Sequence, residues 1–101
     1  MKVTRVQYTV RDGFADENKR NIAAVMTELR ALGRRDVRYA VYLSADGRTF
    51  MHFVHQNTPD AEQFPTSLAS FKHFQAQLKP NLEVAPKVEQ FALVDSATPI
   101  F

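Results

Sequence analysis

The three histidines are the side chains of this sequence best suited to acid–base chemistry near neutral pH, because an imidazole changes charge in that range. Two of them, His52 and His55, form a His-x-x-His pair in a segment rich in Val, Phe and Tyr. On a helix such a pair could bind a metal, but on a strand residues three apart point to opposite faces. The sequence has no cysteine, and no carboxylate is spaced to complete a ligand set. We therefore expect no metal site.

The segment that positions these two histidines is predicted to be a β-hairpin. It is centred on Asp46-Gly47, the dipeptide that most readily supplies the positive φ angles of a two-residue type I′ turn. With that loop, Val41 faces His52, and His55 lies across from Arg38. One face is strongly apolar and should lie under helices; it carries Val37, Tyr39, Val41, Leu43, Phe50, His52 and Val54. The other face is mixed and carries Arg38, Ala40, Tyr42, Ser44, Thr49, Met51, Phe53 and His55.

Hydrophobic periodicity predicts the elements on either side of the hairpin. Asp16 is expected to be the N-cap of a helix that ends before Gly33, and Thr58 the cap of a turn after the hairpin. Pro65 is expected to separate that turn from a second helix. In chain order we predict a strand over 2–10, a helix over 16–32, hairpin strands over 37–44 and 49–55, a helix over 66–79, a loop over 81–86 and a strand over 87–94.

This order of elements predicts an α+β fold, the ferredoxin-like βαββαβ sandwich, with both helices on one face of a four-stranded antiparallel sheet. Residues 1–95 would form one domain and residues 96–101 a C-terminal tail. The helices leave one sheet face open, and its centre is apolar. Such a face is commonly covered by a second copy of itself, which makes a barrel of two sheets. We therefore expect a homodimer with the dimeric α+β barrel arrangement.

Composition excludes several classes of partner. The net charge is only +2, with both signs spread along the chain, so we expect no nucleic-acid partner. No apolar run approaches the roughly 20 residues of a membrane span, and the first residues show no signal-peptide pattern, so we expect a cytoplasmic protein with no membrane partner. RNA-recognition domains share the element order, but residues 48–55 lack their glycine and place the two phenylalanines on opposite faces. Regulatory modules of the ACT type also share this order of strands and helices, but such modules are usually fused to an enzyme.

The sequence resembles dimeric α+β barrel proteins of the antibiotic biosynthesis monooxygenase type. The resemblance rests on residues 38–42 (Arg-Tyr-Ala-Val-Tyr), the Asp46-Gly47 turn and residues 49–53 (Thr-Phe-Met-His-Phe), and continues in residues 70–74 and 91–95. It implies a homodimer with a pocket between sheet and helices, and in some members oxygenation of aromatic polyketides without a cofactor. Relatives degrade haem or isomerise lactones. The haem-degrading members use an Asn-Trp-His set, whereas this chain has no Trp and has Gln56 near the place where many members carry one.

His55 and Tyr42 are the predicted catalytic residues, both on the mixed face. Neutral His55 would deprotonate an activated phenol, whose carbanion reacts with dioxygen, and Tyr42 would orient a substrate hydroxyl. The alternatives are a rim histidine bonded to a carbonyl or water, and a tyrosine that packs at the dimer interface. His52 is interpreted as a buried core histidine. The predicted ligand-binding residues are Arg5, Met51, Phe53 and His73. The alternative for Arg5 is pairing with Glu89 across the dimer, and the alternative for His73 is exposure on a helix.

Two classes of function remain open from the sequence. One is a small dimeric enzyme, oxygenase- or isomerase-like, that acts on a small apolar or aromatic molecule and uses no cofactor. The other is a non-catalytic dimeric module that binds an apolar ligand or a partner. The two classes differ in whether a pocket opens to solvent beside a titratable side chain.

Overall fold

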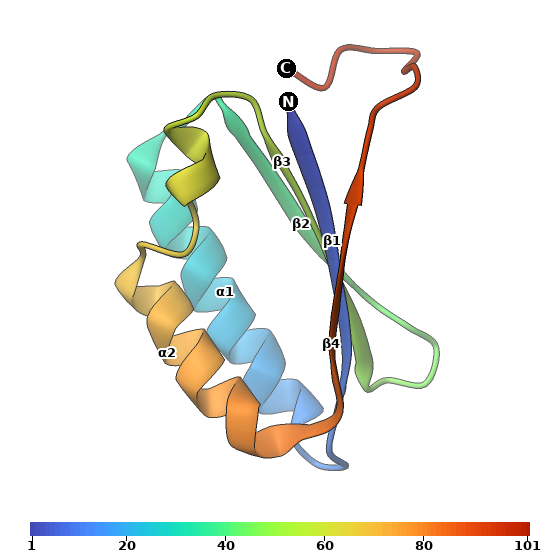
Figure 1. Cartoon of the computed structure of the whole chain (residues 1–101). Coiled ribbons are helices and arrows are strands. Elements are labelled where there is room, and N and C mark those ends of the chain that lie inside the picture. The colour runs from blue at the N-terminus through green and yellow to red at the C-terminus, as the bar shows by residue number, and fades with distance from the viewer.

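The computed structural model describes all 101 residues and has the predicted order of strands and helices (Figure 1). The two helices lie on one face of a four-stranded antiparallel sheet with strand order β2-β3-β1-β4. The predicted ferredoxin-like α+β fold is therefore confirmed. The elements are β1 (Lys2–Val10), α1 (Ala15–Leu32), β2 (Val37–Leu43), β3 (Thr49–Gln56), the 3₁₀ turn η1 (Ala61–Gln63), α2 (Ala69–Leu78), the 3₁₀ turn η2 (Lys79–Asn81) and β4 (Leu82–Phe91).

The predicted register of the hairpin is confirmed, but its turn is wider than predicted. Val41 pairs with His52, and Arg38 with His55. A type I′ turn needs positive φ at both central residues, whereas only Gly47 has one, at 73°. The Asp46 carboxylate accepts hydrogen bonds from the backbone N–H groups of Arg48 and Thr49, at 2.8 and 2.9 Å, and so stabilises a four-residue loop. The loop keeps the register because it adds one residue to each side.

The last strand was predicted too late in the chain. Residues 82–86, predicted as loop, belong to β4, which ends at Phe91. Pro86 is tolerated because β4 is an edge strand, where one side of the backbone needs no partner. Residues 92–101 have no regular secondary structure, and Val94 is 99% exposed. The alternation of apolar and polar residues over 87–94 therefore continues three residues beyond the end of β4.

The starts of both helices also differ from the prediction. The N-cap of α1 is Phe14, and Asp16 lies in the first turn, where its charge still favours the helix dipole. Helix α2 begins at Ala69 because Glu28 of α1 supplies its cap: the Glu28 carboxylate accepts from the N–H and the hydroxyl of Ser70, at 3.1 and 2.6 Å. The predicted cap at Gly33, with φ of 62°, is confirmed. The N-cap of η1 is Asp60 and not Thr58, although the Thr58 hydroxyl accepts from the N–H of Ala61 at 3.0 Å.

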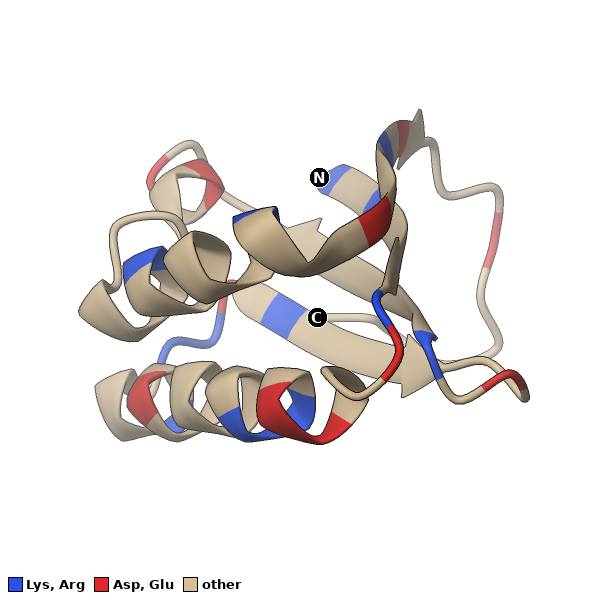
Figure 2. Cartoon of the chain, turned by 90° about the horizontal axis from the view of Figure 1, so that it is seen from below, with Lys and Arg blue, Asp and Glu red and all other residues tan.

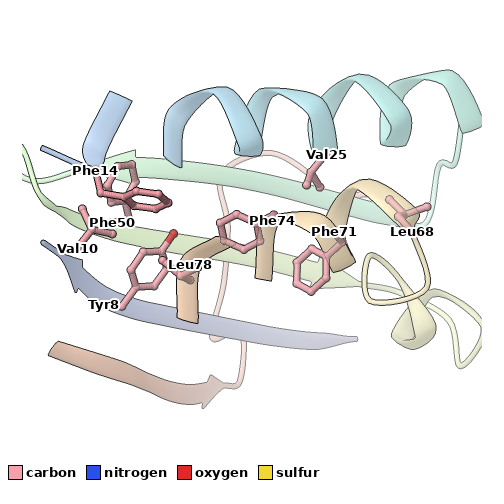
Figure 3. Close-up of a cluster of buried hydrophobic side chains, with 9 residues drawn as sticks. All are labelled: Tyr8, Val10, Phe14, Val25, Phe50, Leu68, Phe71, Phe74 and Leu78. Atoms are coloured by element: carbon pink, nitrogen blue, oxygen red, sulfur yellow. The ribbon is translucent and has the colours of Figure 1, made fainter. Parts of the chain in front are cut away.

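The core lies between the sheet and the two helices (Figure 3). Tyr8 and Phe50 stack with ring centroids 5.7 Å apart, and Phe71 and Phe74 of α2 pack against each other at 5.6 Å. Buried aromatic rings of this size dominate the hydrophobic stabilisation of a small domain. The buried cluster comprises Tyr8, Val10, Phe14, Val25, Phe50, Leu68, Phe71, Phe74 and Leu78.

Charged side chains of both signs occur along α1 and β4 (Figure 2). No single-sign field therefore covers either element. Neither helix is long and apolar enough to cross a membrane.

Candidate ligand-binding cavity

A cavity of about 330 Å³ lies between the sheet and α2. Its walls are mainly apolar, and exposed residues of α2 and β4, such as Gln75 and Val88, also border it. The cavity therefore opens to solvent on the β4 side of the molecule. Its apolar wall comprises Val6, Val54, Phe64, Phe71, Phe74 and Leu78.

Three aromatic side chains with polar atoms, one from each of three adjacent strands, form a hydrogen-bonded group in the wall of this cavity. The Tyr8 hydroxyl of β1 lies 2.8 Å from Nε2 of His52 in β3, and the Tyr39 hydroxyl of β2 lies 2.6 Å from Nδ1 of the same ring. Asn18 of α1 donates from Nδ2 to the Tyr8 hydroxyl at 2.9 Å. The alternation of the strands brings these side chains together, because Tyr8, Tyr39 and His52 occupy positions on the helix-covered face.

Burial keeps this group uncharged at neutral pH. Removal from water lowers the pKa of His52 from 6.5 to about 4. Burial likewise raises the pKa of the Tyr8 and Tyr39 phenols above their ordinary value, although the hydrogen bond from Asn18 opposes the effect at Tyr8. The tyrosines stay protonated and the imidazole stays neutral. The group can therefore exchange hydrogen bonds with a ligand but offers it no counter-charge.

The loop between β3 and α2 completes the cavity wall and is held in two places. Gln56 donates from Nε2 to the carbonyl oxygens of Ala61, at 3.0 Å, and Phe64. On the outer side, the Arg34 guanidinium lies 4.2 Å from the centroid of the Phe64 ring and binds both oxygens of Asp36. Phe64 is therefore fixed from the buried side and from the surface.

Four of the six predicted site residues come together elsewhere, on the open face of the sheet. His55, Tyr42, Met51 and Phe53 line a shallow depression there, which is also bordered by Pro99 and Ile100 of the C-terminal tail. Tyr42 and Phe53 pack edge to face with centroids 5.8 Å apart. The catalytic roles of His55 and Tyr42 stay predictions that belong to this face and not to the cavity.

The other two predicted residues lie apart from both places. Arg5 donates to Gln7 at 2.6 Å and lies 3.6 Å from the Glu89 carboxylate of its own chain. The Arg5–Glu89 pair therefore forms within one chain and not across a dimer as predicted, because β1 and β4 are neighbours that place the two residues opposite each other. His73 is exposed on α2. The ligand-binding roles of Arg5 and His73 remain predictions.

Tyr8, Tyr39 and Asn18 were not predicted from the sequence to belong to one site. His52 was predicted to lie under the helices as a core histidine, and this burial is confirmed, with the side chain 5% exposed. The signal that could have found the site was the set of polar groups on the otherwise apolar face. Tyr39 and His52 share this face in the predicted register of the hairpin, and the pairing of β1 with β3 places Tyr8 on the same face. Asn18 carried no signal, because its partner is on another element.

Nowhere in the chain do three His, Cys, Asp or Glu side chains lie together in an arrangement that could hold a metal ion.

No protein-family model matches the sequence, and a search of curated proteins gives no significant match. Solved structures do match over nearly the whole chain. Rv0793 from Mycobacterium tuberculosis is 21% identical, with a TM-score of 0.78 over 96% of this chain and 98% of that one. An antibiotic biosynthesis monooxygenase is 10% identical, with a TM-score of 0.79 over 94% and 100%. A mutant of SnoaB, a cofactor-independent oxygenase from Streptomyces nogalater, is 13% identical, with a TM-score of 0.69 over 97% and 98%.

The chain therefore has the fold of antibiotic biosynthesis monooxygenase-like proteins. The resemblance to antibiotic biosynthesis monooxygenase-type proteins, which rests on the hairpin and the later elements, is therefore confirmed for the fold. Similarity at these identities establishes the fold, and the function has to be argued from the cavity.

Proposed function

We propose that this protein is a homodimeric, monooxygenase-like enzyme that oxidises a small aromatic molecule in the cavity without a cofactor. The observation that carries the proposal is the neutral group of Tyr8, His52 and Tyr39 at the wall of an apolar cavity that opens to solvent. A solvent-accessible pocket beside a titratable side chain is the feature that favours an enzyme over a packing module. The similarity in fold to a cofactor-independent oxygenase supports the same reading.

The size and walls of the cavity suit a small aromatic ligand. Its volume of about 330 Å³ is at the lower end of small-molecule sites. Phe64, Phe71 and Phe74 offer ring faces and edges to a flat apolar molecule. Lys2 and Glu62 also border the cavity, one charge of each sign. A charged ligand would lose its hydration without gaining a partner at the His52 end, so a neutral molecule is favoured there.

The proposed reaction acts on a substrate whose methylene group is conjugated, through an aromatic ring, with a carbonyl group, and converts this methylene into a second carbonyl group. The substrate loses a proton to solvent and becomes an enolate, which transfers one electron to dioxygen; the radical pair then combines into a carbon–oxygen bond. The resulting hydroperoxide loses water. One oxygen atom enters the product and the other leaves as water, and the substrate supplies all four electrons.

The protein contributes to this reaction mainly through hydrogen bonds to the developing oxyanion. With a pKa near 4, His52 is a weak base and stays neutral throughout. Tyr39 can donate to the enolate oxygen from inside an apolar cavity, where such a bond is stronger than in water. The predicted base chemistry of His55 with Tyr42 would instead take place in the depression on the open face.

The test is oxygen uptake with anthrone, whose methylene group lies between two rings, followed together with the formation of the quinone. We expect Tyr39→Phe to lower kcat about 100-fold, the usual effect of removing one oxyanion donor. Tyr42→Phe, on the other face of the same strand, is the matched control and should leave kcat unchanged. Loss of turnover in Tyr42→Phe or His55→Gln, with Tyr39→Phe unaffected, would move the chemistry to the open face. Binding of anthrone without oxygen uptake would leave a non-catalytic binding module.

The homodimer is proposed from the open face. Tyr42 is 58% exposed, Val84 55% and Phe91 45%, all on this face of a single chain. A second copy packed face to face would remove this apolar surface from water. Sedimentation should give a dimer that Phe53→Glu dissociates, while Leu32→Glu, an equally drastic change at an exposed position of α1, should not. A monomeric wild-type protein would overturn this part of the proposal.

A further inference from the structure

The hydrogen bonds around His52 have a direction, which follows from its supply of donors and acceptors. A neutral imidazole has one N–H donor and one bare nitrogen acceptor. Each ring nitrogen of His52 lies within hydrogen-bond distance of one tyrosine hydroxyl, Tyr8 at Nε2 and Tyr39 at Nδ1. One tyrosine must therefore donate to the ring, and the other must accept from it.

Tyr8 is the tyrosine that donates. Its side chain is 2% exposed, and its only other partner is Nδ2 of Asn18, which is itself a donor. The hydroxyl hydrogen of Tyr8 therefore has no acceptor except Nε2 of His52. Turning the Asn18 amide round would not help, because both of its N–H donors would then be buried without acceptors, whereas in the present orientation one N–H is bonded to Tyr8 and the amide atom without a partner is the oxygen Oδ1. Unpaired buried N–H groups are rarer than unpaired carbonyl oxygens.

The proton of His52 consequently lies on Nδ1 and is donated to Tyr39. The Tyr39 hydroxyl then has a hydrogen of its own that no acceptor within the chain receives. Tyr39 is half-buried and borders the cavity together with His52. The bonds thus run from Asn18 through Tyr8 and His52 to Tyr39, and end in a free O–H group at the cavity.

We infer that Tyr39 determines ligand specificity, because its hydroxyl donates to an oxygen acceptor of the ligand and so selects aromatic carbonyl compounds over aromatic N–H compounds of the same size. This inference deepens the proposed function, on which its ligand part rests. Tyr8 and His52 act as positioning residues, since they determine which way the hydrogen of Tyr39 is available.

The first experiment reads the tautomer of His52 in the ligand-free protein. A long-range proton–nitrogen NMR spectrum distinguishes a protonated from a bare ring nitrogen, and the chain has only three imidazoles to assign. We expect Nδ1 to carry the proton near neutral pH. A proton on Nε2 would overturn the direction of the bonds and with it the role of Tyr39. Asn18→Ala should keep the Nδ1 proton, because the hydrogen of Tyr8 still has only Nε2 to bond.

The second experiment titrates three bicyclic probes into the wild-type protein and follows the NMR shifts. 1-Indanone has only an acceptor, indole only an N–H donor, and indane neither. We expect 1-indanone to bind about tenfold more tightly than indane, with indole no tighter than indane. Tyr39→Phe should bring 1-indanone down to the affinity of indane, whereas the affinity for indane itself should stay the same.

The outcomes separate this inference from the proposed function. Indole binding more tightly than 1-indanone, or a Tyr39→Phe variant that keeps the preference, would overturn the inference while leaving the cavity as a ligand site. Failure of all three probes to shift any cavity resonance would overturn the cavity as a binding site, and with it both proposals. The tautomer of His52 is read without ligand, so it tests the direction of the bonds in either case.

Discussion

The stability of the protein should fall steeply between neutral and mildly acidic pH because of His52. Its pKa is about 4 in the folded chain against 6.5 as the reference for the unfolded chain. The unfolded state therefore binds the proton first, and the stability that neutral His52 contributes is complete above pH 6.5 and is lost as the pH falls toward 4. Linkage with these two values gives a loss of about 2 kcal/mol between about pH 7 and pH 5. This is a large part of the stability of a small domain.

The assay is urea denaturation at several pH values, analysed as a two-state transition. His52→Gln removes the titration and should flatten the pH dependence, whereas His73→Gln, at an exposed position of α2, should retain the slope of the wild type. Asp36 does not interfere in this window: hydrogen bonds from Arg34 and Thr58 lower its pKa from 3.8 to about 2, so its contribution is lost only below about pH 4. An unfolding free energy that changes by less than about 0.5 kcal/mol, or an equal slope in His52→Gln, would refute the reasoning.

Three further predictions concern the elements that hold the cavity. Gly47→Ala should destabilise the protein by about 1 kcal/mol, because a residue with a Cβ is strained at φ of 73°; an unchanged urea midpoint would contradict this. Phe74→Ala should cost about 3–5 kcal/mol by urea denaturation, since it empties a buried ring site between α2 and the sheet; a loss below about 1 kcal/mol would mean that the site collapses. Gln56→Leu should speed amide exchange in residues 57–66 by removing the bonds to Ala61 and Phe64, and equal protection in both proteins would show that the loop is held from its outer side alone.

The fold could be predicted because its central strands obey simple local rules. Alternation in β1 and across the hairpin assigns each side chain to one face, and the Asp46-Gly47 turn sets the register. The structure bears out these assignments, including Val41 opposite His52. The burial of His52 follows from the same pattern.

The errors arise where a residue distant in sequence decides the local structure. Glu28 of α1 caps α2 and moves its start to Ala69, which no local pattern shows. The edge position of β4 admits Pro86, although proline normally argues against a strand. The cavity itself depends on how α2 and the loop at Phe64 pack over the sheet, and this geometry is not encoded in spacing. The prediction accordingly favoured His55, the histidine on the open face of the hairpin, while the structure gives His52 the richer set of contacts.

The alternation of β3 has a consequence for how this protein can change over evolutionary time. Its four even-numbered residues, Phe50 to Gln56, face the core and the cavity, and its four odd-numbered residues, Thr49 to His55, face the open side. Substitutions at even positions alter the surroundings of a ligand, and substitutions at odd positions alter the surface presented to another molecule. The ligand site and the open surface can therefore evolve separately within one strand of eight residues. The insertion of a single residue would instead move the side chains beyond it to the opposite face of the sheet.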